Sequence, residues 1–359
     1  MQTRCSSQEC TTTASDVPLA GALILSPAGK APRLRILFCG EGFTESRRRL
    51  APLLPGHEIT TCPASSTVDC LAGVDVVVPY ISKIDAQIIA KGTFGLVQQF
   101  GVGLDAVDID AATSAGVWVA RVPSRGTGNA ESVAEHALLL MLALSRRLPQ
   151  AQAALAAGIV GDPAGVALWG KTACIVGLGD IGSALAGRLR ACGMRLIAVR
   201  RRPEQSGVAA LGVERVYGPD GLHEALGQAD YVVLCVNYDA ASHHLIDRAA
   251  FAAVKSGAFL VNVARGGLVD PAALREALES GRVAGAGLDV FWMEPPDPGH
   301  PIFKQNVIAT PHVAGVTDAS YDGIARAVAT NILRYANGEA PLFAVNAPPA
   351  AAQRARRQR

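Results

Sequence analysis

The sequence predicts an α/β protein with two doubly wound, parallel-sheet domains. Short apolar runs alternate with segments of helical periodicity from Leu34 onward, a pattern that implies parallel sheets covered on both faces. A glycine-rich turn lies midway along the chain, between an apolar run and a helical segment. The chain has 359 residues, half of them hydrophobic, so it is long enough to bury two cores.

The first half of the chain is expected to form one α/β unit. Its predicted strands are the apolar runs 34–39, 74–78, 96–100 and 117–120. A helical segment over 130–148, with apolar side chains at helical spacing, leads to the second unit. The last predicted helix, about 318–337, is expected to cross back to the first unit, which makes that unit discontinuous.

The second unit starts at the glycine-rich turn. Its predicted strands lie at 172–176, 196–199, 231–236, 259–263, 284–289 and 307–309. The termini have a different composition. Residues 1–32 are rich in Ser, Thr, Ala and Pro and are interpreted as a disordered leader, while 347–359 end in clustered arginines and are interpreted as a disordered basic tail.

The turn itself has the context of a dinucleotide-binding site. It follows the apolar run 173–176 and opens a helical segment, the order strand, turn, helix. In such a turn the first glycine permits the bend, the second lets the backbone approach a pyrophosphate, and the third lets helix pack closely on strand. The helix N-terminus offers N–H groups to phosphates. We expect Rossmann-like domains, with cofactor contacts from Gly177, Gly179, Asp180, Ile181 and Gly182.

The end of the next predicted strand indicates which cofactor is bound. An NAD site usually has a carboxylate about 20 residues after the turn, where it holds the ribose hydroxyls. Here Arg200, Arg201 and Arg202 occupy that position. Because an arginine can pair with a 2′-phosphate, the sequence favours NADPH over NADH. The alternative is a solvated loop in an enzyme that accepts either cofactor.

Composition excludes several classes of protein. The formal net charge is +2, which gives no indication of a nucleic-acid partner, and no apolar run approaches the length that spans a membrane. The eight cysteines have no Cys-x-x-Cys pair and no ligand-like spacing. We therefore expect neither a metal nor disulfides, and a reducing, cytoplasmic location.

Polar side chains follow three predicted strands of the second unit: Arg265, Glu294 and His312. Open α/β sheets bind ligands beyond the carboxyl ends of their strands. The guanidinium of Arg265 suits a carboxylate, and a histidine exchanges protons near neutral pH. A carboxylate such as Glu294 favours the charged form of a neighbouring imidazole. Taken singly, each residue has an ordinary explanation, such as an ion pair, a helix start or a loop histidine.

The order and wording of these segments resemble the D-isomer-specific 2-hydroxyacid dehydrogenase family, whose members include glyoxylate/hydroxypyruvate reductases and D-3-phosphoglycerate dehydrogenases. The resemblance covers about residues 34–346. Besides the glycine turn, the matching segments are Phe100-Gly-Val-Gly-Leu-Asp105, Asn129-Ala-Glu-Ser-Val-Ala-Glu135, Asn262-Val-Ala-Arg-Gly266, Asp289-Val-Phe-x-x-Glu-Pro295 and Thr310-Pro-His312.

The resemblance implies a function for each domain and a role for each site residue. Residues 33–128 and 317–346 would form a substrate domain and 129–316 the dinucleotide-binding domain. Arg265 would bind the substrate carboxylate and carbonyl oxygen, His312 would deliver the proton, and Glu294 would orient and charge the histidine. Asp289 would hydrogen-bond the nicotinamide carboxamide. Further expected cofactor contacts are Cys235, Ala264 and Gly315.

In the first unit, the resemblance implies that backbone amides of Val102 and Gly103 help to hold the carboxylate. Many family members carry an arginine in the loop that here reads Pro79-Tyr-Ile-Ser-Lys83. Because this chain has none, the expectation is either that Lys83 or Ser82 substitutes, with Tyr80 beside them, or that the bound acid is small.

The leading hypothesis is an NADPH-preferring reductase of a small 2-oxo acid such as glyoxylate or hydroxypyruvate. The alternatives are a D-3-phosphoglycerate dehydrogenase and, from another class, a dinucleotide-sensing corepressor of the same fold. The resemblance further implies a homodimer that pairs through its nucleotide-binding domains.

Overall fold

The computed structural model describes residues 32–42, 44–204 and 208–357. The expected leader, 1–32, lies outside these ranges apart from its last residue. The described residues cluster into two compact units: unit 1 comprises those up to Thr127 and from Asp322 onward, and unit 2 comprises those of Gly128–Tyr321.

Unit 1 is built on a five-stranded parallel sheet in the order β2-β1-β3-β4-β5. The strands are β1 (Arg35–Cys39), β2 (Glu58–Cys62), β3 (Val76–Val78), β4 (Leu96–Gln98) and β5 (Trp118–Ala120). Its helices are α1 (Thr44–Leu50), α2 (Ala86–Lys91), α3 (Ile109–Ser114), α10 (Asp318–Ala336, divided between the units) and α11 (Ala350–Arg357), with short 3₁₀ turns η1 (Ala51–Leu53) and η2 (Ala64–Cys70).

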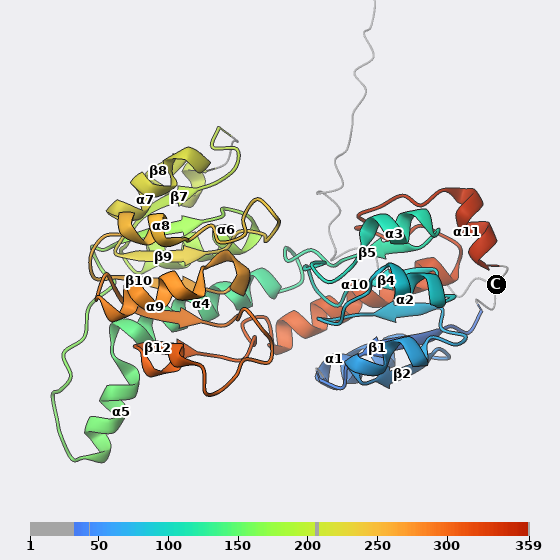
Figure 1. Ribbon diagram of the computed structural model, residues 1–359, viewed down its shortest axis with the longest axis horizontal. Coiled ribbons are helices and arrows are strands. Elements are labelled where there is room, and N and C mark those ends of the chain that lie inside the picture. Colours follow the sequence, from blue (N-terminus) through green and yellow to red (C-terminus); the bar gives the residue numbers. More distant parts are fainter. Residues whose placement is uncertain (1–31, 43, 205–207, 358–359) are drawn as a thin grey trace, which may run out of the picture. The chain divides into compact units, whose positions relative to one another are not determined.

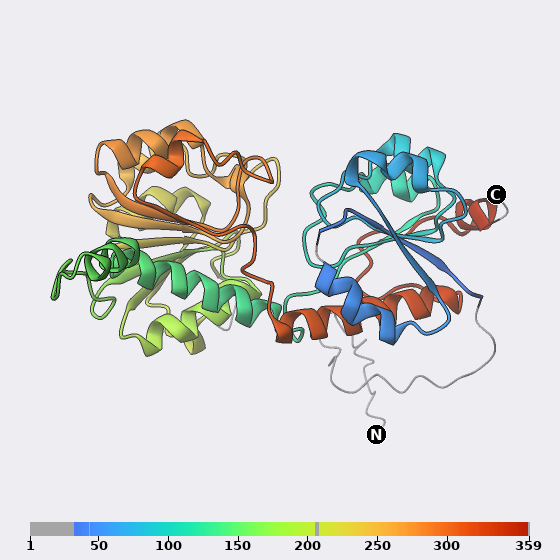
Figure 2. The ribbon, with the colours of Figure 1, turned by 90° about the horizontal axis from the view of Figure 1, so that it is seen from below.

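Both faces of this sheet are buried. Leu37, Val77 and Val97 pack with α2 and α3 on one face, while alternate strand residues such as Ile36 and Val76 point to the other and are equally buried. Figure 2 shows α1 and α10 on the side of the sheet opposite α2 and α3.

Unit 2 holds a seven-stranded parallel sheet in the order β12-β11-β10-β9-β6-β7-β8. Its strands are β6 (Thr172–Val176), β7 (Arg195–Val199), β8 (Arg215–Tyr217), β9 (Tyr231–Leu234), β10 (Ala258–Asn262), β11 (Val283–Leu288) and β12 (Val307–Ala309). Its helices are α4 (Asn129–Ser145), α5 (Leu148–Ala156), α6 (Asp180–Ala191), α7 (Leu222–Gln228), α8 (Arg248–Ala253) and α9 (Pro271–Glu279), with 3₁₀ turns η3 (Ala209–Leu211), η4 (Pro219–Gly221), η5 (Gly266–Leu268) and η6 (Pro301–Lys304).

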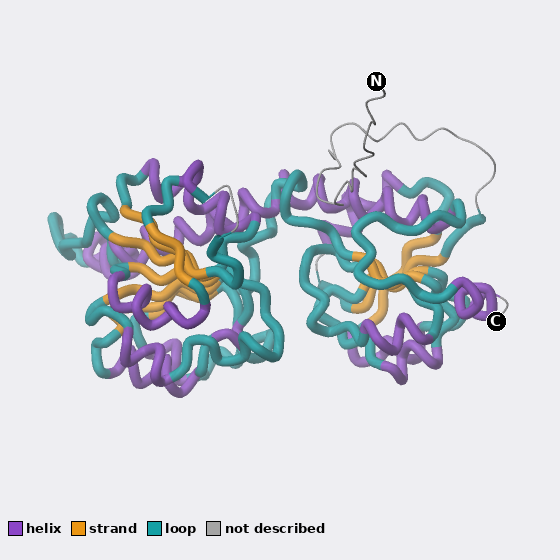
Figure 3. Tube along the Cα trace, turned by 90° about the horizontal axis from the view of Figure 1, so that it is seen from above, coloured by secondary structure: helices purple, strands orange, loops and turns teal. Residues whose placement is uncertain are grey.

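The strands of unit 2 divide their side chains between two cores, one on each face of the sheet. Ala173 and Ile175 of β6 pack against α4 and α6, whereas Cys174 and Val176 pack with α7, α8 and α9. Figure 3 shows the strands of each unit enclosed between layers of helices. The predicted fold class is therefore confirmed, because continuous apolar strands are stable only when both faces are covered.

Two strands were not predicted. β2, with the sequence EITTC, and β8, with the sequence RVY, are edge strands that carry polar and partly exposed side chains. These two edge strands lack the continuous hydrophobic run by which the other strands were recognised, whereas the opposite edges, β5 and β12, are apolar.

The single helix expected over 130–148 is wrong at its end. α4 stops at Ser145, and a second helix, α5, starts at Leu148. Between them Arg147 adopts a left-handed backbone with φ of 49°, which breaks the helical path.

The expected disordered tail over 347–359 is also corrected. Residues 350–357 form α11, and the side chain of Arg356 is buried. Its guanidinium donates to the carbonyl oxygens of Ile89, Gly92 and Phe94 at 2.6–2.8 Å. A terminal charge run is usually solvated, but here one of its members satisfies backbone groups in the interior of unit 1.

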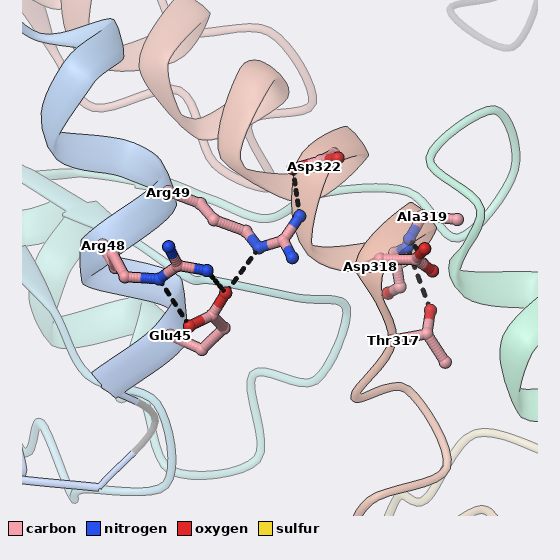
Figure 4. Close-up of polar contacts among 8 residues, drawn as sticks. Glu45, Arg48, Arg49, Thr317, Asp318, Ala319 and Asp322 are labelled. Carbon is pink, nitrogen blue, oxygen red and sulfur yellow. Dashed lines mark hydrogen bonds and ion pairs between the residues drawn. The ribbon is translucent and has the colours of Figure 1, made fainter.

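Ion pairs join α1 to the part of α10 that belongs to unit 1. Arg49 lies between Glu45 and Asp322 and pairs with both, while Arg48 pairs with Glu45 (Figure 4). The hydrogen bonds from Arg48 and Arg49 lower the pKa of Glu45 to about 2. The carboxylate of Glu45 is therefore ionised at any physiological pH.

Candidate active site

The glycine turn lies where the strand order of unit 2 reverses. β6 is flanked by β7 on one side and by β9 on the other, and such a switch point is where open α/β sheets bind ligands. Gly177 follows β6 with φ of 99°, and a Cβ on it would lie 2.6 Å from the backbone carbon of Cys235. Cys235 in turn donates its N–H to Val176 O at 2.7 Å. Only glycine fits at this position.

Gly179 and Gly182 differ in what surrounds them. A Cβ on Gly182 would lie 2.1 Å from Gly177 O, so α6 packs directly on the turn. A Cβ on Gly179 would meet nothing within 4 Å, and its φ of −88° is accessible to any residue. Gly179 also precedes α6 without a side-chain cap, so the turn presents open space in front of the first N–H groups of a helix.

Arg200 and Arg201 lie beyond the end of β7, as expected. The N–H of Arg200 pairs with Tyr217 O of β8. Arg201 Nη2 contacts Asp239 Oδ2 at 2.9 Å. The sequence analysis missed Asp239, because 38 residues separate it from Arg201 and no local pattern marks it. The tertiary fold thus brings a carboxylate next to an arginine that follows β7.

Arg265 lies in the loop after β10, and hydrogen bonds and close packing fix the backbone of this loop. Asn262 accepts the N–H of Ala264 at 3.1 Å and donates to Arg265 O at 2.8 Å. Gly266 lies so close to the 291–292 backbone that a Cβ would be 2.1 Å from the carbonyl carbon of Phe291. The Arg265 loop is therefore packed against the loop that carries Glu294.

Glu294 and His312 are in direct contact, with 2.6 Å between Glu294 Oε2 and His312 Nδ1. Burial raises the pKa of Glu294, but hydrogen bonds and charge from His312, the N–H of Phe291 and the charge of Arg265 together lower it below its ordinary value. An ionised carboxylate only accepts, so Nδ1 carries the proton of this bond. Nε2 is then the nitrogen that can exchange a proton with a substrate.

His312 itself has a left-handed backbone with φ of 54°, which is uncommon for a residue with a side chain. Its N–H donates to Asp289 O at 2.8 Å and to Thr310 O at 3.0 Å. Backbone conformations of this kind persist where the surrounding structure enforces them, and they are frequent at active sites.

Asp289, expected at the nicotinamide, is 1% exposed and organises this loop. Its Oδ1 accepts from the Thr310 hydroxyl at 2.6 Å and the Val313 N–H at 2.9 Å, and its Oδ2 accepts from the Ala314 N–H at 2.9 Å. Gly315 follows, where a Cβ would lie 2.6 Å from Asn129 Oδ1. The carboxylate thus holds the loop on which His312 stands.

A second histidine, not anticipated from the sequence, extends this network. His136 Nε2 lies 2.8 Å from the hydroxyl of Thr310 and 3.5 Å from Asp289 Oδ1. Because the single hydroxyl proton of Thr310 goes to the carboxylate, Nε2 of His136 must carry the proton that it shares with Thr310. In the sequence, His136 could have been noticed only as a polar residue next to the apolar positions Val133 and Ala137, which are buried in α4.

The expected substrate residues of unit 1 lie in the loops that follow β3 and β4. Tyr80 is buried and its hydroxyl contacts Ser46, while Ser82 donates to Cys39 O at 2.6 Å. Lys83 is exposed, with Nζ 3.5 Å from Asp85. Gln99 Nε2 bonds Tyr80 O and Gly103 O, which joins this loop to the segment with Val102 and Gly103. Lys83 thus differs from Tyr80 and Ser82 in presenting its charged group to solvent.

Other functional groups were searched within the described ranges. There, no cluster of three or more His, Cys, Asp and Glu side chains could hold a metal ion. The cysteines in these ranges are free, and burial raises the pKa of Cys235 to about 12, so its thiol is protonated. None of the helices described is long and apolar enough to cross a membrane.

Comparison with known proteins places this site in a family. A model of the D-isomer specific 2-hydroxyacid dehydrogenase NAD-binding domain matches residues 138–314. D-3-phosphoglycerate dehydrogenase from Archaeoglobus fulgidus is 37% identical over 282 residues, which cover 76% of this chain and 51% of that protein. The chain therefore spans about half the length of this curated relative, and the same holds for the Mycobacterium leprae enzyme, at 39% identity and 49% of its length.

Solved structures agree in fold. The TT0316 protein from Thermus thermophilus is 31% identical, with a TM-score of 0.76 over 87% of this chain and 100% of that one. The pyruvate reductase of Chlamydomonas reinhardtii is 28% identical, with a TM-score of 0.72 over 87% of this chain and 98% of that one. The chain belongs to the D-isomer specific 2-hydroxyacid dehydrogenase family, and its unit 2 contains the NAD-binding domain.

Proposed function

We propose that the protein reduces a small 2-oxo acid, such as glyoxylate or hydroxypyruvate, to the 2-hydroxy acid, with the D configuration where the product is chiral. The observation that carries this proposal is the Glu294–His312 pair at 2.6 Å, which belongs to the same unit as Arg265 and the glycine turn. A histidine held by an ionised carboxylate, together with a guanidinium, suits reduction of a carbonyl beside a carboxylate.

The chain's own residues have distinct tasks in this reaction. Arg265 binds the carboxylate and polarises the carbonyl oxygen. A reduced nicotinamide cofactor held at the glycine turn would supply the hydride for the carbonyl carbon. As charge develops on the oxygen, His312 donates its Nε2 proton, and Glu294 stabilises the imidazolium that precedes this transfer. Three further assignments stay predictions. They are the cofactor contacts of Asp289, Ala264 and Gly315, the substrate contacts of the unit 1 residues, and the domain boundaries.

A D-3-phosphoglycerate dehydrogenase is the second candidate. The curated relatives with 37–39% identity carry that name, although the chain spans only about half of their length. The pyruvate reductase likeness instead favours a small, unphosphorylated acid. These two candidates require different substrates, so kinetics separates them.

The decisive experiment is a panel of 2-oxo acids with the full chain, followed by the loss of reduced-nicotinamide absorbance. Glyoxylate, hydroxypyruvate, pyruvate and 3-phosphohydroxypyruvate are compared at equal concentration with NADPH and with NADH. Highest kcat/KM with a small acid supports the proposal, and highest kcat/KM with the phosphorylated acid supports the second candidate. If no acid is reduced although the protein still binds the cofactor, a dinucleotide-sensing role is favoured.

We further propose that NADPH is preferred over NADH. Arg200 and Arg201 stand beyond β7, where a 2′-phosphate would lie, and guanidinium forks suit phosphate. The double variant Arg200→Asp with Arg201→Ser should reverse the preference, because it removes the phosphate partner and adds a repelling carboxylate. Raising salt should weaken NADPH binding more than NADH binding. Equal or better NADH kinetics of the unaltered protein at low salt contradict this proposal.

We also infer a homodimer formed through unit 2, and a reducing, cytoplasmic location in keeping with the free thiols. α5 projects from the rest of unit 2 (Figure 1), and large apolar side chains on α4, α5 and the loop after them are exposed. They are Leu139, Leu142, Leu148, Leu155, Ile159 and Val160. Exposed apolar clusters commonly mark interfaces. Light scattering should give twice the chain mass, and Leu155→Glu should shift it toward the monomer.

A further inference from the structure

The ion pair between Arg201 and Asp239 joins the ends of two strands that flank the glycine turn. Arg201 follows β7 and Asp239 follows β9, and both strands pair with β6. Their side chains meet at 2.9 Å between Nη2 and Oδ2. The group expected to hold a 2′-phosphate therefore already has a carboxylate partner from the protein.

Asp239 is held in place by its own loop. Its Oδ1 accepts the Ser242 N–H at 2.9 Å, and its N–H donates to the Ser242 hydroxyl at 2.7 Å. The hydrogen bonds from Ser242 and Arg201 lower the pKa of Asp239. The carboxylate is thus both pre-positioned and ionised at neutral pH, and it does not need to be ordered before it meets Arg201.

We propose that Asp239 is a specificity-determining residue, which competes with the cofactor's 2′-phosphate for Arg201 and thereby restrains the preference for NADPH. This inference rests on the proposed placement of the adenosine ribose at the end of β7. A 2′-phosphate must share the guanidinium with the carboxylate or displace it, and the two anions repel. A free 2′-hydroxyl carries no such penalty, so NADH is affected less.

The size of the effect follows from exposure. The side chains of Arg201 and Asp239 are 76% and 44% exposed, so water and salt screen the pair. Exposed ion pairs alter affinities by a few-fold, and we expect Asp239→Asn to raise the preference for NADPH about threefold to fivefold. Asparagine keeps an oxygen that can accept from Ser242, so the variant removes the charge and retains the turn.

The test measures dissociation constants of NADPH and NADH by calorimetry at low salt, since the two differ only in the 2′-phosphate. The full chain, its Asp239→Asn variant and the control Asp220→Asn are compared. Asp220 is an exposed carboxylate of η4 in the same unit, and its replacement should leave the ratio of the two constants unchanged. In Asp239→Asn the ratio should shift toward NADPH, and the shift should be smaller when Asp239→Asn is made in an Arg201→Ser background and compared with Arg201→Ser alone.

Three results overturn the inference. They are an unchanged ratio in Asp239→Asn, an equal loss of affinity for both cofactors, and a shift of undiminished size in the Arg201→Ser background. The readout is binding and needs no substrate. Failure of the proposed reductase activity is therefore seen separately, as the absence of turnover by a protein that still binds cofactor.

Discussion

The guanidinium of Arg265 carries two tasks in the proposed reaction, the anchoring of the carboxylate and the polarisation of the carbonyl. Arg265→Ala should lower kcat/KM at least about 100-fold, which corresponds to about 2.7 kcal/mol of transition-state stabilisation. Arg265→Lys should recover part of this loss, because an ammonium keeps the charge without the fork. The affinity for NADPH should change little. Near-normal turnover in Arg265→Ala would transfer the anchoring role to Lys83.

The Glu294–His312 pair predicts a pH effect whose direction is fixed. Reduction needs the charged imidazolium, and Glu294, whose pKa is lowered, remains anionic throughout the neutral range and stabilises it. In Glu294→Gln that stabilisation is lost, so the alkaline limb of kcat/KM for reduction should move to lower pH. His312→Ala should depress kcat much more than substrate affinity. A pH profile that does not move in Glu294→Gln removes Glu294 from the mechanism.

At the scale of elements, α6 offers a matched pair of glycines. Gly182 lies where a Cβ would be 2.1 Å from Gly177 O, while Gly187, in the same helix, has open space around it. Gly182→Ala should lower the free energy of unfolding by about 1–3 kcal/mol through overpacking. Gly187→Ala should raise it by about 0.5–1 kcal/mol through helix propensity. Urea unfolding of both variants checks this, and equal effects would show that α6 does not constrain the turn.

The elements that could be predicted are those with an internal signal. The central strands of both sheets are mostly apolar because both of their faces are covered, and the glycine turn is marked by the strand before it and the helix after it. β2 and β8 were not predicted from the sequence because these two edge strands carry polar side chains. The break between α4 and α5 was not predicted because arginine has no preference for the left-handed backbone conformation that Arg147 adopts.

For the molecule as a whole, the C-terminal helix α11 is expected to contribute to stability. Arg356 satisfies three backbone carbonyl oxygens and lies over the ring of Phe94, 5.1 Å from its centroid. Arg356→Ala leaves these acceptors without that partner and should lower the free energy of unfolding by about 3 kcal/mol. The exposed Arg354 is the control, and Arg354→Ala should change stability by less than about 0.5 kcal/mol. Equal melting temperatures of the two variants would contradict this account.

Local pattern alone was sufficient for the fold class, for the strand–turn–helix unit at Gly177 and for the family, since periodicity and motif are properties of neighbouring residues. It also marked Arg265, Glu294 and His312 as candidates, though singly each had an ordinary explanation. Only the folded chain brings Glu294 within 2.6 Å of His312, Asp239 to Arg201 and His136 to Thr310. These partners are 18, 38 and 174 residues apart. Contacts at such separations depend on how the strands are ordered and how helices pack on them, which periodicity along the chain does not encode.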